Sequence, residues 1–201
     1  MTPMDTALAE HKRLDAASYD AAAGEFDRLT GRLAAPLARE TLALARLGPA
    51  DRVLDVGTGT GLVALQAAAA LRGGGGSVVG IDHSEGLLRK AADKARRRGL
   101  EAMAEFRRMD AEALELDGAG FDAVVSLFVP LHLPGPAAAV REMRRVLKPG
   151  GRQVVGVGRG PRLASRAGVV QAARRVAAEV GAARGRLVHG LGAMLHTARC
   201  P

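Results

Sequence analysis

The chain has 201 residues, of which 48% are hydrophobic and only 2% aromatic, and its formal net charge is +8. This length suits one α/β domain and is short for two. The single cysteine, Cys200, excludes a disulfide framework or a cysteine metal site within one chain, and we expect no metal. No apolar run reaches the length of a membrane-spanning helix, so we expect a soluble, cytoplasmic protein without a membrane span.

The predicted elements alternate along the chain. Two helical segments, about 7–27 and 31–46, predict an N-terminal helical cap over residues 1–50. Strands are expected at 52–56, 77–81, 105–109, 121–127 and 152–157, with helices at 62–71, 85–98 and 137–147 between them. This alternation predicts a Rossmann-like, doubly wound, mostly parallel α/β sheet as the core at 51–160. A helix at 162–180 and one weak strand candidate at 186–191 make up a C-terminal segment, 161–201, within the same single domain.

The most informative segment runs from Val53 to Gly61 and reads Val-Leu-Asp-Val-Gly-Thr-Gly-Thr-Gly. A short apolar strand ends in three glycines at alternate positions, and a helical pattern begins at Leu62. Glycine is needed where the backbone turns at positive φ or lies against a ligand. Asp82, at the end of the next strand, has the spacing of an acid that accepts hydrogen bonds from a ribose diol. These features predict a site for a nucleoside-bearing cofactor.

The glycine spacing favours one type of cofactor. The dinucleotide fingerprint G-x-G-x-x-G presents a helix N-terminus to a diphosphate, whereas here the third glycine comes one residue early. No phosphate-binding G-x-x-x-x-G-K-[ST] is present. Asp55, two residues before the first glycine, suits a ligand with an ammonium group and no phosphate, and S-adenosylmethionine has that profile. A tight turn without a ligand is the alternative, which Asp82 disfavours.

Polar residues follow or close four of the predicted strands. These residues are Asp55, Asp82, Asp110 and Ser126. In open α/β sheets, ligands bind in the crevice at the carboxyl ends of the strands. The agreement across four elements therefore predicts one shared crevice.

With these residues placed, the chain resembles the class I S-adenosylmethionine-dependent methyltransferases over about residues 19–157. It is most similar to the small-molecule branch that includes the ubiquinone/menaquinone C-methyltransferases. The motif at 53–61 is similar to the first motif of the family, and further similar segments lie at 79–82, 109–111, 121–126 and 145–151. The resemblance implies S-adenosylmethionine as cofactor and S-adenosylhomocysteine as product.

The resemblance also implies roles for individual residues. The methionine end of the cofactor would contact Asp55, Gly57, Thr58 and Gly59. The ribose would contact Asp82, and the adenine would contact His83, Asp110 and Ala111. Ser126 and Leu127 would line the floor of the site near the sulfonium. Tyr19 and Phe26 fall where relatives carry a Tyr-Asp element in an N-terminal helix over the cofactor. Ordinary core contacts of that helix are an equally open interpretation for these two residues.

Two departures from the family pattern stand out. His132 is a single histidine where relatives often carry a pair, and we expect it to be a structural or substrate-pocket residue, with a role as general base as the alternative. The tail lacks a clear final strand. We therefore expect an incomplete sheet whose tail packs as helix or mediates a homodimer, and a more open crevice.

The expected function is methyl transfer to a small-molecule acceptor, with O-, C- or N-methylation left open. Most of the positively charged residues are arginines, and we interpret them mainly as residues on solvent-exposed helix faces. Binding of an acidic substrate or of a nucleic acid would also explain the positive charge. The chain has no Asn/Asp-Pro-Pro-aromatic motif and no internal catalytic cysteine, which argues against a nucleic-acid acceptor. Two alternatives stay open: a cofactor-binding module whose activity is lost or depends on a partner, and an RNA methyltransferase.

Overall fold

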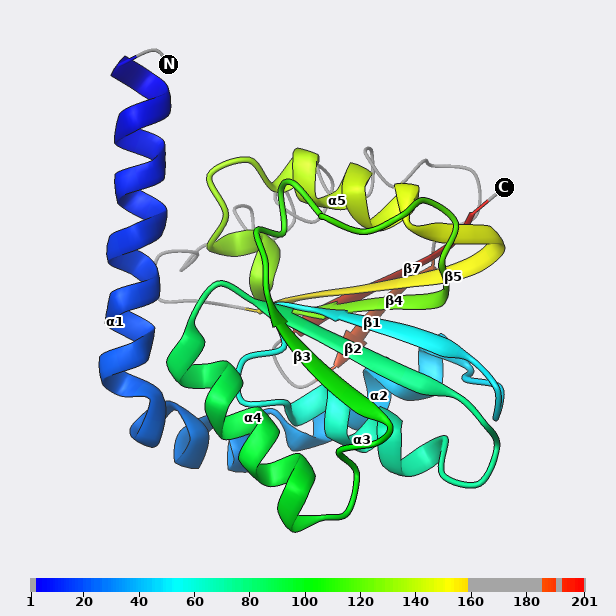
Figure 1. The fold of residues 1–201 in the computed structure, drawn as a ribbon. Helices are drawn as coiled ribbons and strands as arrows, with labels where there is room; N and C mark the ends of the chain where they lie inside the picture. Colours follow the sequence, from blue (N-terminus) through cyan, green and yellow to red (C-terminus); the bar gives the residue numbers. More distant parts are fainter. Residues whose placement is uncertain (1–2, 159–185, 191–192, 201) are drawn as a thin grey trace.

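The computed structural model describes residues 3–158, 186–190 and 193–200 (Figure 1). The helices are α1 (Pro3–Leu33), α2 (Ala35–Ala45), α3 (Leu62–Ala70), α4 (Glu85–Arg97) and α5 (Pro136–Arg145), with a 3-10 turn η1 (Val129–Leu131). The strands are β1 (Arg52–Val56), β2 (Ser77–Asp82), β3 (Ala104–Arg108), β4 (Phe121–Leu127), β5 (Leu147–Gly158), β6 (Arg186–Gly190) and β7 (Ala193–Arg199). None of these helices is long and apolar enough to cross a membrane.

The strands form one sheet in the order β3-β2-β1-β4-β5-β7-β6. The first five are parallel to one another, as the alternation of strands and helices predicts. Helices α2, α3 and α4 cover one face and α5 covers the other (Figure 1). The expectation of a Rossmann-like, doubly wound, mostly parallel sheet is confirmed.

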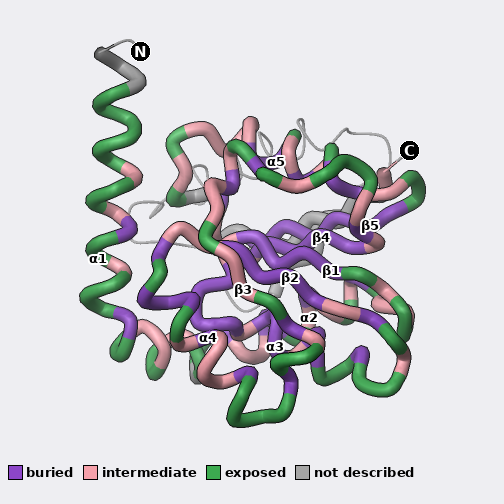
Figure 2. Tube along the Cα trace, in the orientation of Figure 1, coloured by how far each residue is buried: buried purple, intermediate pink, exposed green. Residues whose placement is uncertain are grey.

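Each face of the sheet has its own core of small aliphatic side chains. Val53 and Val125 point into the core under α2 and α3, whereas Leu54 and Val124 point into the core under α5. Because successive side chains of a strand alternate between faces, a strand covered on both sides must be apolar throughout. Figure 2 shows this burial along the central strands, whereas much of α1 is exposed.

The expectation of an incomplete sheet is wrong. Strand β7 pairs antiparallel with β5, for example Thr197 with Val154, and β6 pairs antiparallel with β7. A sheet that ended at β5 would leave a row of unpaired backbone groups, and the tail strands remove that edge. The homodimer expected through the C-terminal segment was inferred from an exposed edge at β5, and β7 occupies that edge. The helix expected at 162–180 lies outside the described residues.

The N-terminal helices differ from the prediction in their boundary. The break falls at Ala34 rather than near Arg28, and Gly31 lies within α1. Proline favours the first turn of a helix, where its missing N–H is not needed, and Pro36 occupies that position in α2. Helix α1 is therefore long enough to cross the carboxyl ends of the parallel strands (Figure 1).

Candidate functional site

The glycine loop joins β1 to α3. Gly57, Gly59 and Gly61 have φ angles of 69°, 55° and 81°, so all three adopt the left-handed conformation that glycine permits. The Thr58 N–H donates to the Ile81 carbonyl at 2.8 Å, which holds the loop against the end of β2.

Other parts of the chain approach this loop closely. A Cβ built on Gly57 would overlap the side chain of Val129 in η1, and one on Gly59 would lie 3.4 Å from the ring of Phe26 in α1. The segment after β4 and the N-terminal helix thus both rest on the glycine loop. At Gly57, the missing side chain makes room for the protein itself.

We expect Gly57→Ala to lower the free energy of unfolding by roughly 2–5 kcal/mol, from left-handed strain and from overlap with Val129. Gly75 is a matched control because it also has positive φ, at +84°, but a Cβ there meets nothing within 4 Å. Gly75→Ala should cost only the strain, about 1–2 kcal/mol. Urea unfolding of both variants measures the difference, and equal losses would contradict the close approach of Val129.

Asp55 is the most deeply buried of the three strand-end acids and is 1% exposed. Its Oδ2 accepts hydrogen bonds from Thr58 Oγ1 at 2.8 Å and from the Ala64 N–H, in the first turn of α3, at 3.0 Å. Burial raises the pKa of Asp55 to about 7, even though both bonds favour the ionised form. The carboxyl group is therefore poised to change charge near neutral pH.

Asp82 closes β2 beside the glycine loop. Its Oδ2 accepts from the Gly59 N–H at 2.9 Å and its Oδ1 from the Ser84 N–H at 3.0 Å. Burial raises the pKa of Asp82 despite these backbone bonds. The next residue, His83, has Nε2 3.4 Å from Asp15 Oδ2 of α1.

Asp110 follows β3 and is paired with α1. Lys12 Nζ lies 2.7 Å from Asp110 Oδ2 and 2.5 Å from Glu112 Oε2. Burial acts to raise the pKa of Asp110, but Lys12 and the Glu112 N–H hold it below its usual value. Ala111, between the two acids, is buried in the core under α5.

The end of β4 contributes a buried hydroxyl. In the described part of the chain, Ser126 Oγ is buried without a hydrogen-bond partner. Buried polar atoms are almost always hydrogen-bonded, so an orphaned one at a strand end points to a partner that arrives from outside the chain. Leu127 next to it packs against the opposite core.

Helix α1 lies over the ends of β1, β2 and β3, and polar contacts at several positions along the helix hold it there. Asp20 accepts from Ser84 Oγ at 2.5 Å and from the Gly86 N–H at 2.7 Å, at the start of α4. Asp27 accepts from Thr60 Oγ1 at 2.6 Å and pairs with Lys94. These polar contacts connect α1 to the glycine loop and to α4.

The aromatic side chains of α1 point into the same region. The rings of Tyr19 and Phe26 meet edge to face at 5.5 Å, and Tyr19 meets His132 in the same way at 6.3 Å. Burial raises the pKa of Tyr19, and the carboxylates of Asp15 and Asp82 raise it further. Tyr19 therefore lies between the strand-end acids and His132.

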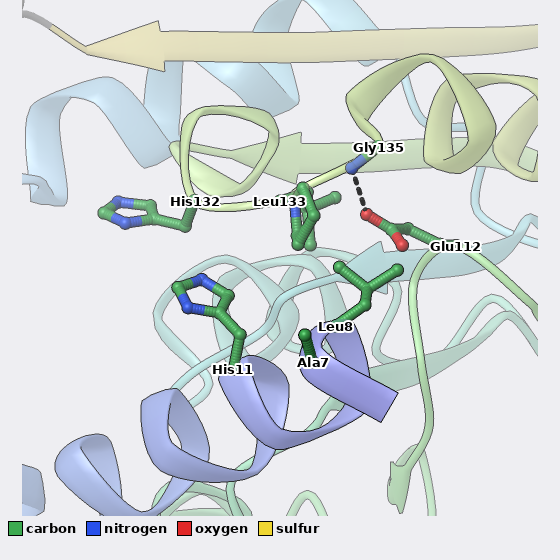
Figure 3. Close-up of a pocket in the computed structure, with 8 residues that line it drawn as sticks. Ala7, Leu8, His11, Glu112, His132, Leu133 and Gly135 are labelled. Atoms are coloured by element: carbon green, nitrogen blue, oxygen red, sulfur yellow. Dashed lines mark hydrogen bonds between the residues drawn. The ribbon is translucent and has the colours of Figure 1, made fainter. Parts of the chain in front are cut away.

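A cavity of about 600 Å³ opens between α1 and the segment after η1 (Figure 3). Its lining residues are Ala7, Leu8, His11, Glu112, His132, Leu133, Pro134 and Gly135. Of the predicted site residues, His132 is the one that lines this cavity. The predicted acids Asp55, Asp82 and Asp110 are not among its lining residues and lie at or just after the ends of β1, β2 and β3.

The sequence located the strand-end residues and, through the resemblance, Tyr19 and Phe26 of α1, but it missed Lys12, His11 and Glu112. Lys12, Tyr19 and Phe26 are spaced by seven residues, which places them on one helix face. This spacing is a signal that could have marked the covering face of α1. In the described residues, no group of three or more His, Cys, Asp or Glu could hold a metal ion.

The geometry fits a nucleoside-bearing ligand with a cationic end better than a dinucleotide. Three acids lie at or just after the ends of neighbouring strands: Asp55 near the end of β1, Asp82 at the end of β2 and Asp110 after β3. In the described part of the chain, the buried Ser126 hydroxyl near the end of β4 has no partner. Carboxylates suit ammonium, ribose and amino groups, whereas a diphosphate would be repelled by them. The fold and these acids define the Rossmann-like class of domains that bind such cofactors.

Comparison with known proteins identifies the family. Residues 53–151 match the family model described as a methyltransferase domain. The chain is 40% identical over 104 residues to phosphatidylethanolamine N-methyltransferase of Cereibacter sphaeroides, which is 52% of this chain and 49% of that protein. It is 36% identical over 129 residues to a ubiquinone/menaquinone biosynthesis C-methyltransferase of Pseudomonas putida, which is 64% of this chain and 50% of that one. The chain thus spans about half the length of these curated relatives.

A solved structure shares the fold. A putative S-adenosylmethionine-dependent methyltransferase from Methanococcus maripaludis superposes with a TM-score of 0.74 at 19% identity, over 89% of this chain and 91% of that one. The chain therefore carries a class I S-adenosylmethionine-dependent methyltransferase domain, and S-adenosylmethionine is its cofactor, as the sequence predicts.

Proposed function

We propose that the chain transfers the methyl group of S-adenosylmethionine to a small-molecule acceptor. The observation that carries the proposal is the row of three strand-end acids beneath α1, next to a cavity lined by His132. A volume of about 600 Å³ lies within the usual range for small-molecule sites. The names of the two curated relatives, which refer to a phospholipid and a quinone, also support a small acceptor.

In this proposal the crevice residues hold the cofactor from end to end. Asp55 meets the ammonium group of the methionine end, with the glycine loop beside it, and Asp82 accepts from the ribose hydroxyls. Asp110 accepts from the adenine amino group, with His83 and Ala111 next to it. The remaining members of the set are Tyr19, Gly57, Thr58, Gly59, Ser126 and Leu127.

The cofactor supplies a methyl group on a sulfonium, which is already activated for in-line displacement. The protein then has to orient the acceptor and keep water out. Helix α1 does both in this account, because it covers the crevice and forms one wall of the cavity. In this account His132 accepts a proton where the acceptor must lose one.

Calorimetric titration tests the cofactor assignment. We expect S-adenosylhomocysteine to bind with a dissociation constant in the micromolar range and NAD to give no binding heat, because the crevice presents acids where a diphosphate would lie. Tighter binding of NAD would overturn the assignment.

A further inference from the structure

The cavity beside His132 has apolar walls and two imidazole groups. Ala7 and Leu8 from α1 face Leu133 and Pro134 from the segment after η1. His11 of α1 and His132 lie at the same end of the cavity, one on each side of it (Figure 3). An apolar cleft with a few convergent polar groups is the usual form of a small-molecule site.

The cavity adjoins the place where the methyl group would be transferred. His132 follows η1 directly, and Val129 of η1 lies against Gly57 of the glycine loop. On its other side, the His132 ring meets the ring of Tyr19. The position of His132 is thus fixed by contacts that also shape the cofactor crevice.

Among the described residues that line the cavity, Glu112 carries the one carboxylate, and this group is already engaged. Glu112 Oε1 accepts from the Gly135 N–H at 2.6 Å (Figure 3). Its Oε2 pairs with Lys12 Nζ at 2.5 Å. Lys12 balances its charge, and the Glu112 side chain is only 10% exposed. Among the eight lining residues there is no other acid and no arginine. Among these eight residues, a cationic amine finds no free counter-charge and an anionic headgroup finds no guanidinium.

We propose that this cavity binds an acceptor with an apolar body and an acidic hydroxyl group, a phenol or an enol, and that His11 acts with His132 on that hydroxyl. The proposal rests on the methyltransferase function proposed above. One imidazole donates a hydrogen bond to the hydroxyl oxygen and the other accepts its proton, since neutral imidazole offers one donor and one acceptor nitrogen. When the acceptor gains the methyl group, its proton moves to that acceptor nitrogen and the electron pair of the broken carbon–sulfur bond stays on sulfur.

Two probes with the same apolar body test this pocket. We expect 2-naphthol to bind to the protein saturated with S-adenosylhomocysteine, observed through naphthol fluorescence, and 2-naphthylmethylamine, which carries an ammonium group, to bind at least tenfold more weakly. His11→Gln and His132→Gln should each weaken naphthol binding tenfold or more. Arg13→Gln is the control on the same helix, because Arg13 is exposed and pairs with Glu10 outside the cavity.

Calorimetry with S-adenosylhomocysteine on the same variants separates local from general effects. We expect both histidine variants to bind it like the wild type, which a merely structural role of either histidine would not allow. Unchanged naphthol affinity in both variants would overturn the proposal. So would equal binding of the ammonium probe, or no naphthol binding at millimolar concentration to a protein that binds S-adenosylhomocysteine. If the wild type binds no S-adenosylhomocysteine, the proposed function fails first, and this inference with it.

Discussion

Replacing Asp82 by alanine is expected to raise the dissociation constant of S-adenosylhomocysteine tenfold or more. In the proposed complex this carboxylate accepts hydrogen bonds from the ribose, and bonds to a charged group contribute about 1.5–3 kcal/mol each. One such bond already corresponds to about a tenfold change. Calorimetry of wild type and variant measures the effect directly.

The structure adds a cost that the strand-end position alone does not reveal. Asp82 also accepts from the N–H groups of Gly59 and Ser84, so the alanine variant loses bonds that hold the glycine loop. Asp82→Asn keeps an acceptor oxygen and should fall between wild type and alanine. Asp122→Asn is the matched control, because that acid, on β4, bonds to the N–H of Arg52 at the start of β1, at the opposite end of the sheet. Unchanged affinity in Asp82→Ala would show that the ribose is held elsewhere.

Replacing Asp55 by asparagine is expected to stabilise the ligand-free protein at pH 8. The folded protein holds the Asp55 proton up to about pH 7, whereas the ordinary pKa of the group is 3.8. Because the folded state binds this proton more tightly, the stabilising effect is complete below about pH 4 and is lost as the pH rises towards 7. A shift of this size corresponds to a loss on the order of 2–4 kcal/mol.

Denaturant unfolding between pH 4 and pH 8 measures this contribution. The wild type should lose stability across that range, and Asp55→Asn should lose less, since asparagine has no proton to release and its oxygen can still accept from Thr58 and Ala64. The same slope in both proteins would contradict the buried, protonated state of Asp55.

Asp55 should affect cofactor affinity in the opposite direction: stability falls as the pH rises, whereas affinity should increase. An ammonium group beside Asp55 favours the ionised carboxylate, so affinity for S-adenosylhomocysteine should rise with pH up to about 7. Calorimetry in two buffers with different ionisation enthalpies should detect a released proton below pH 7. Asp55→Asn should bind more weakly and without this pH dependence.

The central strands could be predicted from the sequence because the signal for each strand lies within its own residues. β1 and β4 begin and end at the predicted residues, since strands buried on both faces read as continuous apolar runs. The glycine loop is equally readable, because three left-handed residues in a short turn require glycine. The strand-end acids follow from the same pattern.

The tail and the α1 contacts could not be predicted in this way. β7 reads Ala-Met-Leu-His-Thr-Ala-Arg, which has no continuous apolar run. Its pairing is favoured by the free edge of β5, which no local pattern reveals. The ion pairs of Lys12 with Asp110 and Glu112 join residues about a hundred positions apart. The cavity depends on these contacts, so His11 and Glu112 gained a role only when the fold was known.

The most direct test of this account is a crystal structure with S-adenosylhomocysteine bound. The account predicts the ribose hydroxyls within hydrogen-bond distance of Asp82, the adenine amino group on Asp110, and the sulfur atom facing the cavity that His11 and His132 line. A ligand bound away from the glycine loop, or with its sulfur atom turned away from that cavity, would contradict it.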